Sequence, residues 1–292
     1  GNSIWHVTRF EFEKRILGCN VSASVRHGDT AATCSCGLVK MELKTKARYD
    51  AASSSWVRKS PISLSDFTGR PSLFEECGDV KGAAILDLGC GEGYCARHFA
   101  AGGAALIDGI DISPKMIEAA KQADYQNTNV SFEVGNITSL SPVKAKYDNV
   151  VGCFVYNYLS IEETYKSMAE VHRVLKNGGK FSFCVPHPAF PFIKREKTRP
   201  FFFDFGNSGY FSGRDTRSYG KIWRRDGLEL PVEMHHKLIS DYFDALKLAG
   251  FNLMPKIKEL GVTAEILKID EEFFSPLSDV PLHMLFSVTK AS

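Results

Sequence analysis

Residues 84–94 constrain the fold of this chain more than any other segment. They begin with an apolar run that is broken only by Asp87, which predicts a buried strand, and Gly89, Gly91 and Gly93 follow at alternate positions. The residues after Gly93 predict the first turns of a helix. Glycine adopts positive φ angles and has no β-carbon, so a ligand can approach the backbone of such a turn closely. We therefore expect a nucleotide-binding turn within an α/β fold.

A second apolar run, residues 104–111, ends in another acid, Asp111. Asp111 follows Asp87 at close to the ~20-residue offset at which an acid reaches ribose hydroxyls in nucleotide-binding α/β folds. Ser113 and Pro114 then predict the start of a helix, with serine as the N-cap and proline at the first helical position. The two strand ends are thus expected to act together on one ligand.

The spacing Gly89-x-Gly91-x-Gly93 after an embedded acid resembles motif I of the class I S-adenosylmethionine-dependent methyltransferases, and residues 109–117 resemble the second motif of that family. The resemblance implies a Rossmann-like, doubly wound sheet of seven strands, mostly parallel with an antiparallel last strand, and helices on both faces. It also implies S-adenosyl-L-methionine as the cofactor. A glycine-rich turn also occurs in nucleotide-binding oxidoreductases, which are the alternative class, but the G-x-G-x-x-G spacing typical of those enzymes is absent here.

The rest of the family's core follows in order. A helix that ends with residues 172–177 is expected to be stopped by Gly178 and Gly179, and another ends near Gly250. The helix position of His172 favours a structural role. The remaining predicted strands are residues 104–111, 130–134, 147–155, 180–185, 252–259 and 281–290.

The resemblance also carries cofactor contacts onto individual residues. In the family, the position of Asn136 is usually an aspartate that accepts a hydrogen bond from the adenine amino group; an amide oxygen can accept the same bond without a charge. Tyr49, in a short lead-in helix, corresponds to a residue that covers the methionine end of the cofactor in relatives. The cofactor-binding residues implied are Tyr49, Asp87, Gly89, Cys90, Gly91, Gly93, Asp111, Ile112, Met116, Asn136, Ile137 and Phe154.

The acceptor is expected to be chosen by residues 187–235, where the chain leaves the common core. Between residues 190 and 223 aromatic and basic residues interleave, and glycines deny the segment a long regular element. This composition suits a lid over an apolar acceptor that carries an acidic group. A single-stranded nucleic acid platform and an insertion that packs on the core or on a partner protein are the alternatives.

Methyl transfer needs a general base only where the acceptor must lose a proton. His187 and His236 are the candidate catalytic bases, because imidazole titrates near neutral pH. Tyr156, Asn157, Tyr210 and Arg217 are the candidate substrate-binding residues.

Composition limits the other function classes. The formal net charge is +2, which argues against a general nucleic-acid binder, and no apolar run is long enough to span a membrane. Most of the eight cysteines are interpreted as reduced, buried thiols in an intracellular protein. Cys19, Cys34 and Cys36, with His27 between them, match no standard zinc spacing, so no metal site is predicted.

The chain is divided into an N-terminal extension with the lead-in helix, residues 1–60, and a methyltransferase domain, residues 61–292. The extension is basic and rich in serine, which is compatible with a processed transit peptide as well as with a trimmed chain, so the cytoplasm and an organelle matrix or stroma are both expected locations. The predicted function is methyl transfer to a small molecule. The alternative is an inactive homologue that serves as a structural subunit of a larger complex, with the extension or residues 190–225 contacting a protein partner.

Overall fold

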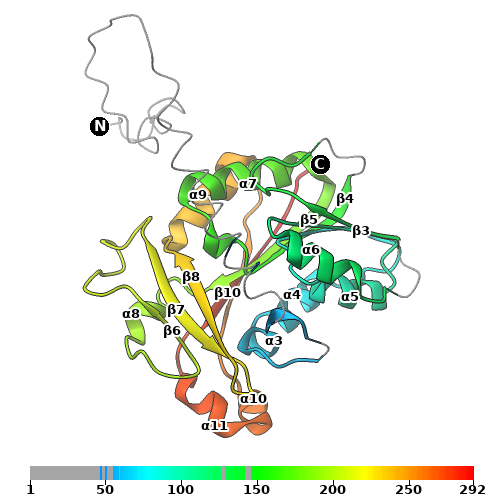
Figure 1. Cartoon of the computed structure of the whole chain (residues 1–292). Coiled ribbons are helices and arrows are strands. Elements are labelled where there is room, and N and C mark those ends of the chain that lie inside the picture. The colour runs from blue at the N-terminus through cyan, green and yellow to red at the C-terminus, as the bar shows by residue number, and fades with distance from the viewer. Residues whose placement is uncertain (1–46, 48–49, 51–54, 59, 126–128, 142–145) are drawn as a thin grey trace, which may run out of the picture. The chain divides into compact units, whose positions relative to one another are not determined.

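A seven-stranded sheet organises the described part of the chain (Figure 1). Its first five strands in spatial order are parallel to one another, and the sixth is antiparallel to both of its neighbours. The strands in spatial order are β3 (Asn129–Val134), β2 (Leu106–Asp111), β1 (Ala84–Leu88), β4 (Tyr147–Cys153), β5 (Leu175–Pro186), β10 (His283–Thr289) and β9 (Lys256–Leu260). The predicted Rossmann-like sheet with an antiparallel last strand is confirmed.

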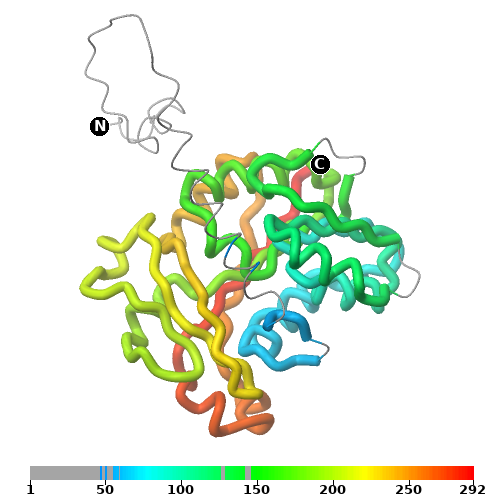
Figure 2. The backbone as a smooth tube through the Cα atoms, in the orientation of Figure 1, coloured from blue at the N-terminus to red at the C-terminus, as the bar shows by residue number. Residues whose placement is uncertain are grey.

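The computed structural model describes residues 47, 50, 55–58, 60–125, 129–141 and 146–292. All of these residues fall in one unit, Glu42–Ser292, and Figure 2 traces their backbone. Tyr49, His27, Cys19, Cys34 and Cys36 lie outside the described residues. Of the helices in the described ranges, none is long and apolar enough to cross a membrane.

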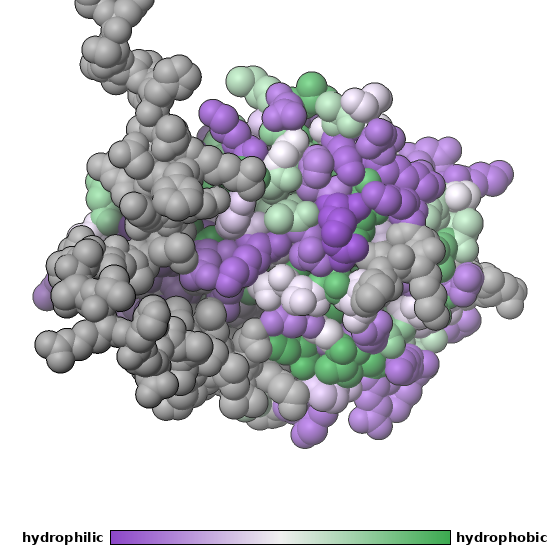
Figure 3. Space-filling view, turned by 90° about the horizontal axis from the view of Figure 1, so that it is seen from above, coloured by the Kyte–Doolittle hydropathy of each residue, from purple (hydrophilic) through white to green (hydrophobic). Residues whose placement is uncertain are grey.

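Helices cover both faces of the sheet, because alternate residues of each buried strand point to opposite sides. On one face, Leu86 and Val150 pack with α7 (Ile161–Val174) and α9 (Ile239–Ala249). On the other face, Ile85 and Val151 pack with three helices. These are α4 (Arg70–Cys77), α5 (Tyr94–Ala101) and α6 (Pro114–Lys121). From above, the described residues on the side of α7 and α9 are a mixture of hydrophilic and hydrophobic side chains (Figure 3).

The fifth strand begins earlier than predicted. Helix α7 ends at Val174, and β5 starts at Leu175, whereas the sequence indicated a helix that continued to the glycines. Leu175 pairs with Tyr147, and the register shifts before the pair of Lys180 with Asn149. Gly178, at φ +76°, lies within this irregular stretch, so the glycines make a bulge in the strand rather than a helix stop.

A second sheet occupies the segment that was predicted to lack a long regular element. Its strands are β6 (Phe201–Asp204), β7 (Arg217–Trp223) and β8 (Glu229–His235), paired antiparallel in that order. Gly220, in the middle of β7, is required there because a β-carbon would collide with the carbonyl oxygen of Phe202 on β6. The glycine therefore allows close strand approach instead of breaking the strand.

Many of the aromatic residues of this segment belong to the protein core. Phe201, Phe203 and Phe190 pack with β8 residues and with Phe274 in one buried cluster. The short elements around this sheet are α3 (Leu64–Thr68), η1 (Tyr156–Tyr158), α8 (Phe190–Ile193), α10 (Ala264–Ile269), α11 (Glu271–Phe274) and η2 (Ser275–Leu277). The last three lie between β9 and β10 and were not predicted. Thus the inner face of the small sheet is fixed by packing, while Phe211 remains 78% exposed.

Candidate functional site

The glycine turn after β1 has the conformation that its sequence predicts. Gly89, Gly91 and Gly93 all have positive φ angles, +65°, +55° and +81°. A β-carbon on Gly89 would lie 2.5 Å from Cγ2 of Val155, and one on Gly93 would collide with the hydroxyl of Tyr125. A β-carbon on Gly91 would meet no described atom within 4 Å. Gly91 is therefore the point at which the turn presents bare backbone to open space.

Asp111 closes the turn from the end of β2. Its Oδ2 accepts a hydrogen bond of 2.9 Å from the Gly91 amide, and its Oδ1 accepts one of 2.9 Å from the Ser113 amide. Burial raises the pKa of Asp111, and these two amide donors act against the rise. Ser113 caps α6 and donates its hydroxyl to Asp50 at 2.6 Å. The lead-in segment thus reaches the same strand end.

Two buried polar atoms beside the turn have no hydrogen-bond partner among the described residues: Oδ2 of Asp87 and Nε of Arg70. Asp87 is 1% exposed, and burial raises its pKa well above the ordinary value. Arg70 uses its Nη1 to bond Asp66 at 2.8 Å. A free carboxylate oxygen and a free guanidinium N–H are complementary to a ligand that carries both an ammonium and a carboxylate group.

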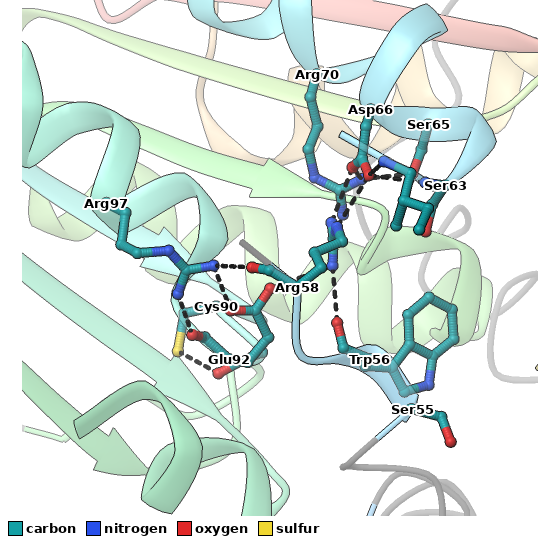
Figure 4. Close-up of polar contacts among 12 residues, drawn as sticks. Ser55, Trp56, Arg58, Ser63, Ser65, Asp66, Arg70, Cys90, Glu92 and Arg97 are labelled. Carbon is teal, nitrogen blue, oxygen red and sulfur yellow. Dashed lines mark hydrogen bonds and ion pairs between the residues drawn. The ribbon is translucent and has the colours of Figure 1, made fainter. Parts of the chain in front are cut away.

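A buried ionic network joins the lead-in segment to the glycine turn (Figure 4). Arg58 donates to both carboxylate oxygens of Asp66 at 2.9 Å and to Glu92 at 3.2 Å. Arg97 donates to the side chain of Glu92 and, at 3.0 Å, to the carbonyl oxygen of Arg58. Burial acts to raise the pKa of Asp66, but Arg70 and Arg58 outweigh it and lower that pKa. Sequence reasoning missed this network, because no local pattern pairs residue 58 with residue 92.

The end of β4 packs against the turn and against α4. Phe154 has a φ angle of +59°, unusual for a residue with a side chain, and such strain is concentrated at functional sites. Its ring lies 4.6 Å from the ring of His283, and a β-carbon on Gly69 would be 2.5 Å from its Cζ. The ring of Phe154 therefore faces α4, and its neighbour Val155, which the sequence analysis did not select, touches the turn.

The other predicted cofactor residues lie around these strand ends. Asn136 follows β3, and its Oδ1 accepts hydrogen bonds of 2.9 Å from both the amide and the hydroxyl of Thr138. The amide oxygen expected to accept from adenine is thus already used twice within the chain. Cys90, Met116 and Ile137 are buried, and Ile137 belongs to the core cluster around β1, whereas Ile112 is half-buried.

The segment after β4 runs beside β8 and the residues that follow it. Asn157 donates from Nδ2 to the carbonyl oxygen of Glu233 at 3.4 Å. Further along, Lys237 donates from Nζ to the carbonyl oxygen of Leu159, and burial lowers the pKa of this lysine to about 7. We call this contact, formed by residues 155–161 and 233–237, the β8 seam. It joins the end of β4 to the small sheet, so that the two sheets meet beside the glycine turn.

All four predicted substrate residues lie in or near the β8 seam, but they differ in what their side chains contact. Arg217 pairs with the buried Glu233 at 3.2 Å, and Tyr210 accepts the amide hydrogen of Ile239 at 3.2 Å. Asn157 is 3% exposed, and its Oδ1 has no partner among the described residues. Tyr156 is fully buried, with its hydroxyl 3.0 Å from that of Ser167, which is a core position rather than a site wall.

The two predicted bases are far from equivalent. His187 uses both ring nitrogens: Nε2 lies 2.9 Å from a carboxylate oxygen of Glu259, and Nδ1 accepts the Ala189 amide at 3.1 Å. His236 contacts the carbonyl oxygen of Tyr210 through Nε2 at 2.8 Å, burial lowers its pKa, and its Nδ1 has no partner among the described residues. His187 is thus held on β9, whereas His236 lies next to the β8 seam.

The neighbouring His235 was not selected from the sequence. Its Nε2 lies 3.0 Å from Oδ1 of Asp215, and its Nδ1 is buried with no partner in the described ranges. Those same ranges contain no cluster of three or more His, Cys, Asp or Glu residues placed to hold a metal ion.

Comparison with known proteins agrees with this arrangement. A family model described as "Methyltransferase domain" matches residues 85–179. The chain is 30% identical over 159 residues to aklanonic acid methyltransferase DauC of Streptomyces sp., covering 51% of this chain and 70% of that protein. It is 30% identical over 132 residues to demethylmenaquinone methyltransferase of Lactococcus lactis, covering 43% of this chain and 51% of that protein. Apart from the Streptomyces protein, the chain spans about half the length of the first curated relatives that it matches.

A solved structure shows the same fold. The S-adenosylmethionine dependent methyltransferase from Mesorhizobium loti superposes with a TM-score of 0.58, covering 75% of this chain and 96% of that chain at 23% identity. The fold is therefore shared across almost the whole of that protein.

Proposed function

This chain belongs to the class I S-adenosylmethionine-dependent methyltransferases, and we propose that it transfers the cofactor's methyl group to a small molecule with an apolar body. The observation that carries the proposal is the glycine turn: three left-handed glycines leave bare backbone open at Gly91 while Asp111 fixes the turn from β2. Relatives named as methyltransferases of aklanonic acid and demethylmenaquinone support a small-molecule acceptor.

The residues beside the turn fit the cofactor. S-adenosylmethionine carries an ammonium and a carboxylate on its methionine portion, and a buried carboxylate oxygen of Asp87 and a buried N–H of Arg70 have no partner among the described residues. We propose that Asp87 accepts from the ammonium group and that Arg70 faces the carboxylate. Gly89, Gly91 and Gly93 admit the ligand, and Asp111, Ile112, Met116 and Asn136 surround its nucleoside portion.

When bound, the cofactor supplies an electrophilic methyl group on a sulfonium sulfur. The chain's own part is to hold the acceptor in line with that methyl group and to exclude water. Val155 and Asn157 follow the turn-facing end of β4, so we place the acceptor between the glycine turn and the β8 seam. Arg217 and Arg214 are each paired with a carboxylate, of Glu233 and Asp241, which leaves the apolar body as the main basis of recognition.

Calorimetry with S-adenosylmethionine and S-adenosylhomocysteine tests this function. We expect the wild-type chain to bind both, and Asp111→Ala to lose detectable binding. Asp108→Ala is the matched control: Asp108 lies on the same strand and also accepts two hydrogen bonds, from Ser131 and from Tyr147, the latter at 2.7 Å. If the wild type binds neither ligand, the enzyme proposal fails, and an inactive subunit of a larger complex becomes the better proposal.

A further inference from the structure

We propose that His235, oriented by Asp215, accepts the proton of a hydroxyl group on the acceptor, so that the product is a methyl ether rather than a methyl ester. This inference rests on the methyl transfer proposed above and names the chemical class of its substrate. It assigns a base that sequence reasoning did not select.

The hydrogen bonds of His235 determine which ring nitrogen is basic. Nε2 lies 2.7 Å from the carbonyl oxygen of Asp215 and 3.0 Å from its carboxylate oxygen Oδ1. Both partners are acceptors, so Nε2 carries the hydrogen, and Nδ1 in the neutral ring presents a lone pair. Nδ1 is buried and has no partner among the described residues. A carboxylate on one ring nitrogen and a free lone pair on the other is the arrangement of a general base.

Asp215 is itself fixed to the catalytic end of the large sheet. Its Oδ1 also accepts the amide hydrogen of Ile161, the first residue of α7, at 3.1 Å. Burial acts to raise the pKa of Asp215, but the hydrogen bonds from His235 and Ile161 hold it below the ordinary value, so it remains an anion. The dyad of His235 and Asp215 is thereby attached to the segment that follows β4, where ligands bind in open α/β sheets.

A second buried atom without a hydrogen-bond partner among the described residues favours an acceptor molecule with a hydroxyl over one with a carboxylate. Oδ1 of Asn157 is buried and lacks a partner among the described residues, and it is also an acceptor. Each of these two acceptors requires a group that donates a hydrogen bond, which a phenol or enol supplies and an ionised carboxylate does not. The single hydrogen of a hydroxyl serves one of them at a time. The nearby guanidinium of Arg217, which would favour a carboxylate, is paired with the buried Glu233.

The charges facing His235 come from every element around it. Asp215 lies on the turn before β7, Arg217 is directly opposite on β7, and Lys237 bonds the carbonyl oxygen of His235 at 3.1 Å. The negative charges of Glu163 on α7 and Asp241 on α9 act to raise the pKa of Lys237, against the effect of burial. With Glu233 on the same face of β8, the surroundings hold both signs of charge, so protonated His235 is tolerated during the reaction.

A lone pair of the hydroxyl oxygen forms the new bond to the methyl carbon, while the bond from that carbon to the sulfonium sulfur breaks and its electron pair stays on the now neutral sulfur. The hydroxyl proton moves to Nδ1 of His235 and is then released to water. No oxidant or further co-reactant is needed.

The test compares 1-naphthol with 1-naphthoate and 1-methoxynaphthalene, which share one apolar ring system and differ in the group that the dyad would meet. Binding is measured by calorimetry with S-adenosylhomocysteine present, and turnover by the S-adenosylhomocysteine formed from S-adenosylmethionine. We expect 1-naphthol to bind at least tenfold more tightly than the other two and to give the methyl ether. Equal or tighter binding of 1-naphthoate, or binding of none of the three to a chain that binds the cofactor, would overturn the proposal.

Variants separate the base from its neighbours. His235→Gln keeps a donor for Asp215 but removes the basic nitrogen, so we expect kcat to fall about 100-fold or more while cofactor binding is unchanged. The loss should appear in kcat, with the KM for 1-naphthol changed much less. Asp215→Asn should lower kcat by a smaller factor than His235→Gln does. His172→Gln, at the far end of α7, is the control and should match the wild type.

The same assay decides between the candidate histidines. If His236→Gln or His187→Gln loses activity while His235→Gln retains it, the proton acceptor is the other histidine and this assignment is wrong. If the wild-type chain did not bind the cofactor, that result would instead contradict the proposed function itself.

Discussion

Cγ2 of Val155 lies 2.5 Å from the position that a β-carbon on Gly89 would occupy. The end of β4 therefore rests directly on the backbone of the glycine turn, and the turn's conformation depends on a strand that follows it by some sixty residues. Glycine at position 89 serves packing, whereas glycine at position 91 faces open space. The two glycines of one motif thus have different tasks.

That difference predicts unequal effects of the same substitution. Gly91→Ala should cost about 1–2 kcal/mol of unfolding free energy, the cost of a left-handed residue with a β-carbon. Gly89→Ala should cost roughly 1–3 kcal/mol more, because Val155 has to move. Urea unfolding measures both. Adding Val155→Ala to Gly89→Ala should recover part of the loss, and equal losses for the two single variants would contradict the account.

The buried network predicts that the lead-in segment stabilises the cofactor side of the fold. Arg58→Ala leaves Asp66 and Glu92 buried with fewer partners, and breaking a buried ion pair in this way costs about 3–5 kcal/mol. Lys176→Ala removes an exposed pair with Asp148 and should cost about 0–1 kcal/mol. Thermal and urea unfolding of both variants provide the comparison; similar small losses would show that Arg58 is not structurally important.

The hydrogen bonds of Asn136 indicate that replacing it with aspartate should increase the affinity for the cofactor. Its amide oxygen already accepts twice from Thr138, so little capacity is left for the adenine amino group. Asn136→Asp keeps an oxygen for Thr138 and adds a second, charged acceptor, and we expect S-adenosylmethionine to bind several-fold more tightly, about 1 kcal/mol. Asn136→Ala should bind more weakly than the wild type. Calorimetry distinguishes these results, and weaker binding by the aspartate variant would rule out an adenine contact at this position.

Lys237 predicts how stability depends on alkaline pH. Burial lowers its pKa to about 7 from 10.5. Between these values the unfolded chain holds a proton that the folded chain releases, so the unfolding free energy should rise with pH, at up to about 1.4 kcal/mol per pH unit. Below pH 7 both states are protonated and this slope disappears.

Urea unfolding at pH 6, 7, 8 and 9 measures that slope. Lys237→Met should remove it, and Lys247→Met, an exposed lysine on α9, should keep it. A wild-type slope that persists unchanged in Lys237→Met would show that another group titrates in this range.

The large sheet could be predicted from the sequence because its signals are local. Strand β1, its glycines and Asp111 each follow from adjacent residues, and the α9 helix ends at Gly250 as its pattern indicates. The small sheet could not, because Gly220 and the aromatic residues around it resemble a loop until β6 is placed beside β7. The pairs of Arg58 with Glu92 and of His235 with Asp215 could not be predicted either, because only the tertiary fold brings the two residues of each pair together.

The β8 seam has a consequence for redesigning this chain. The matched family segment ends at residue 179, whereas β8, its last residue His235 and the following His236 lie beyond it. One half of the proposed acceptor side thus comes from sequence that the family model does not include, and the other half, residues 155–161, comes from within it. A change of substrate preference would therefore have to be made in both halves together. A new small sheet grafted alone would still face Asn157 and Leu159 of the original segment after β4.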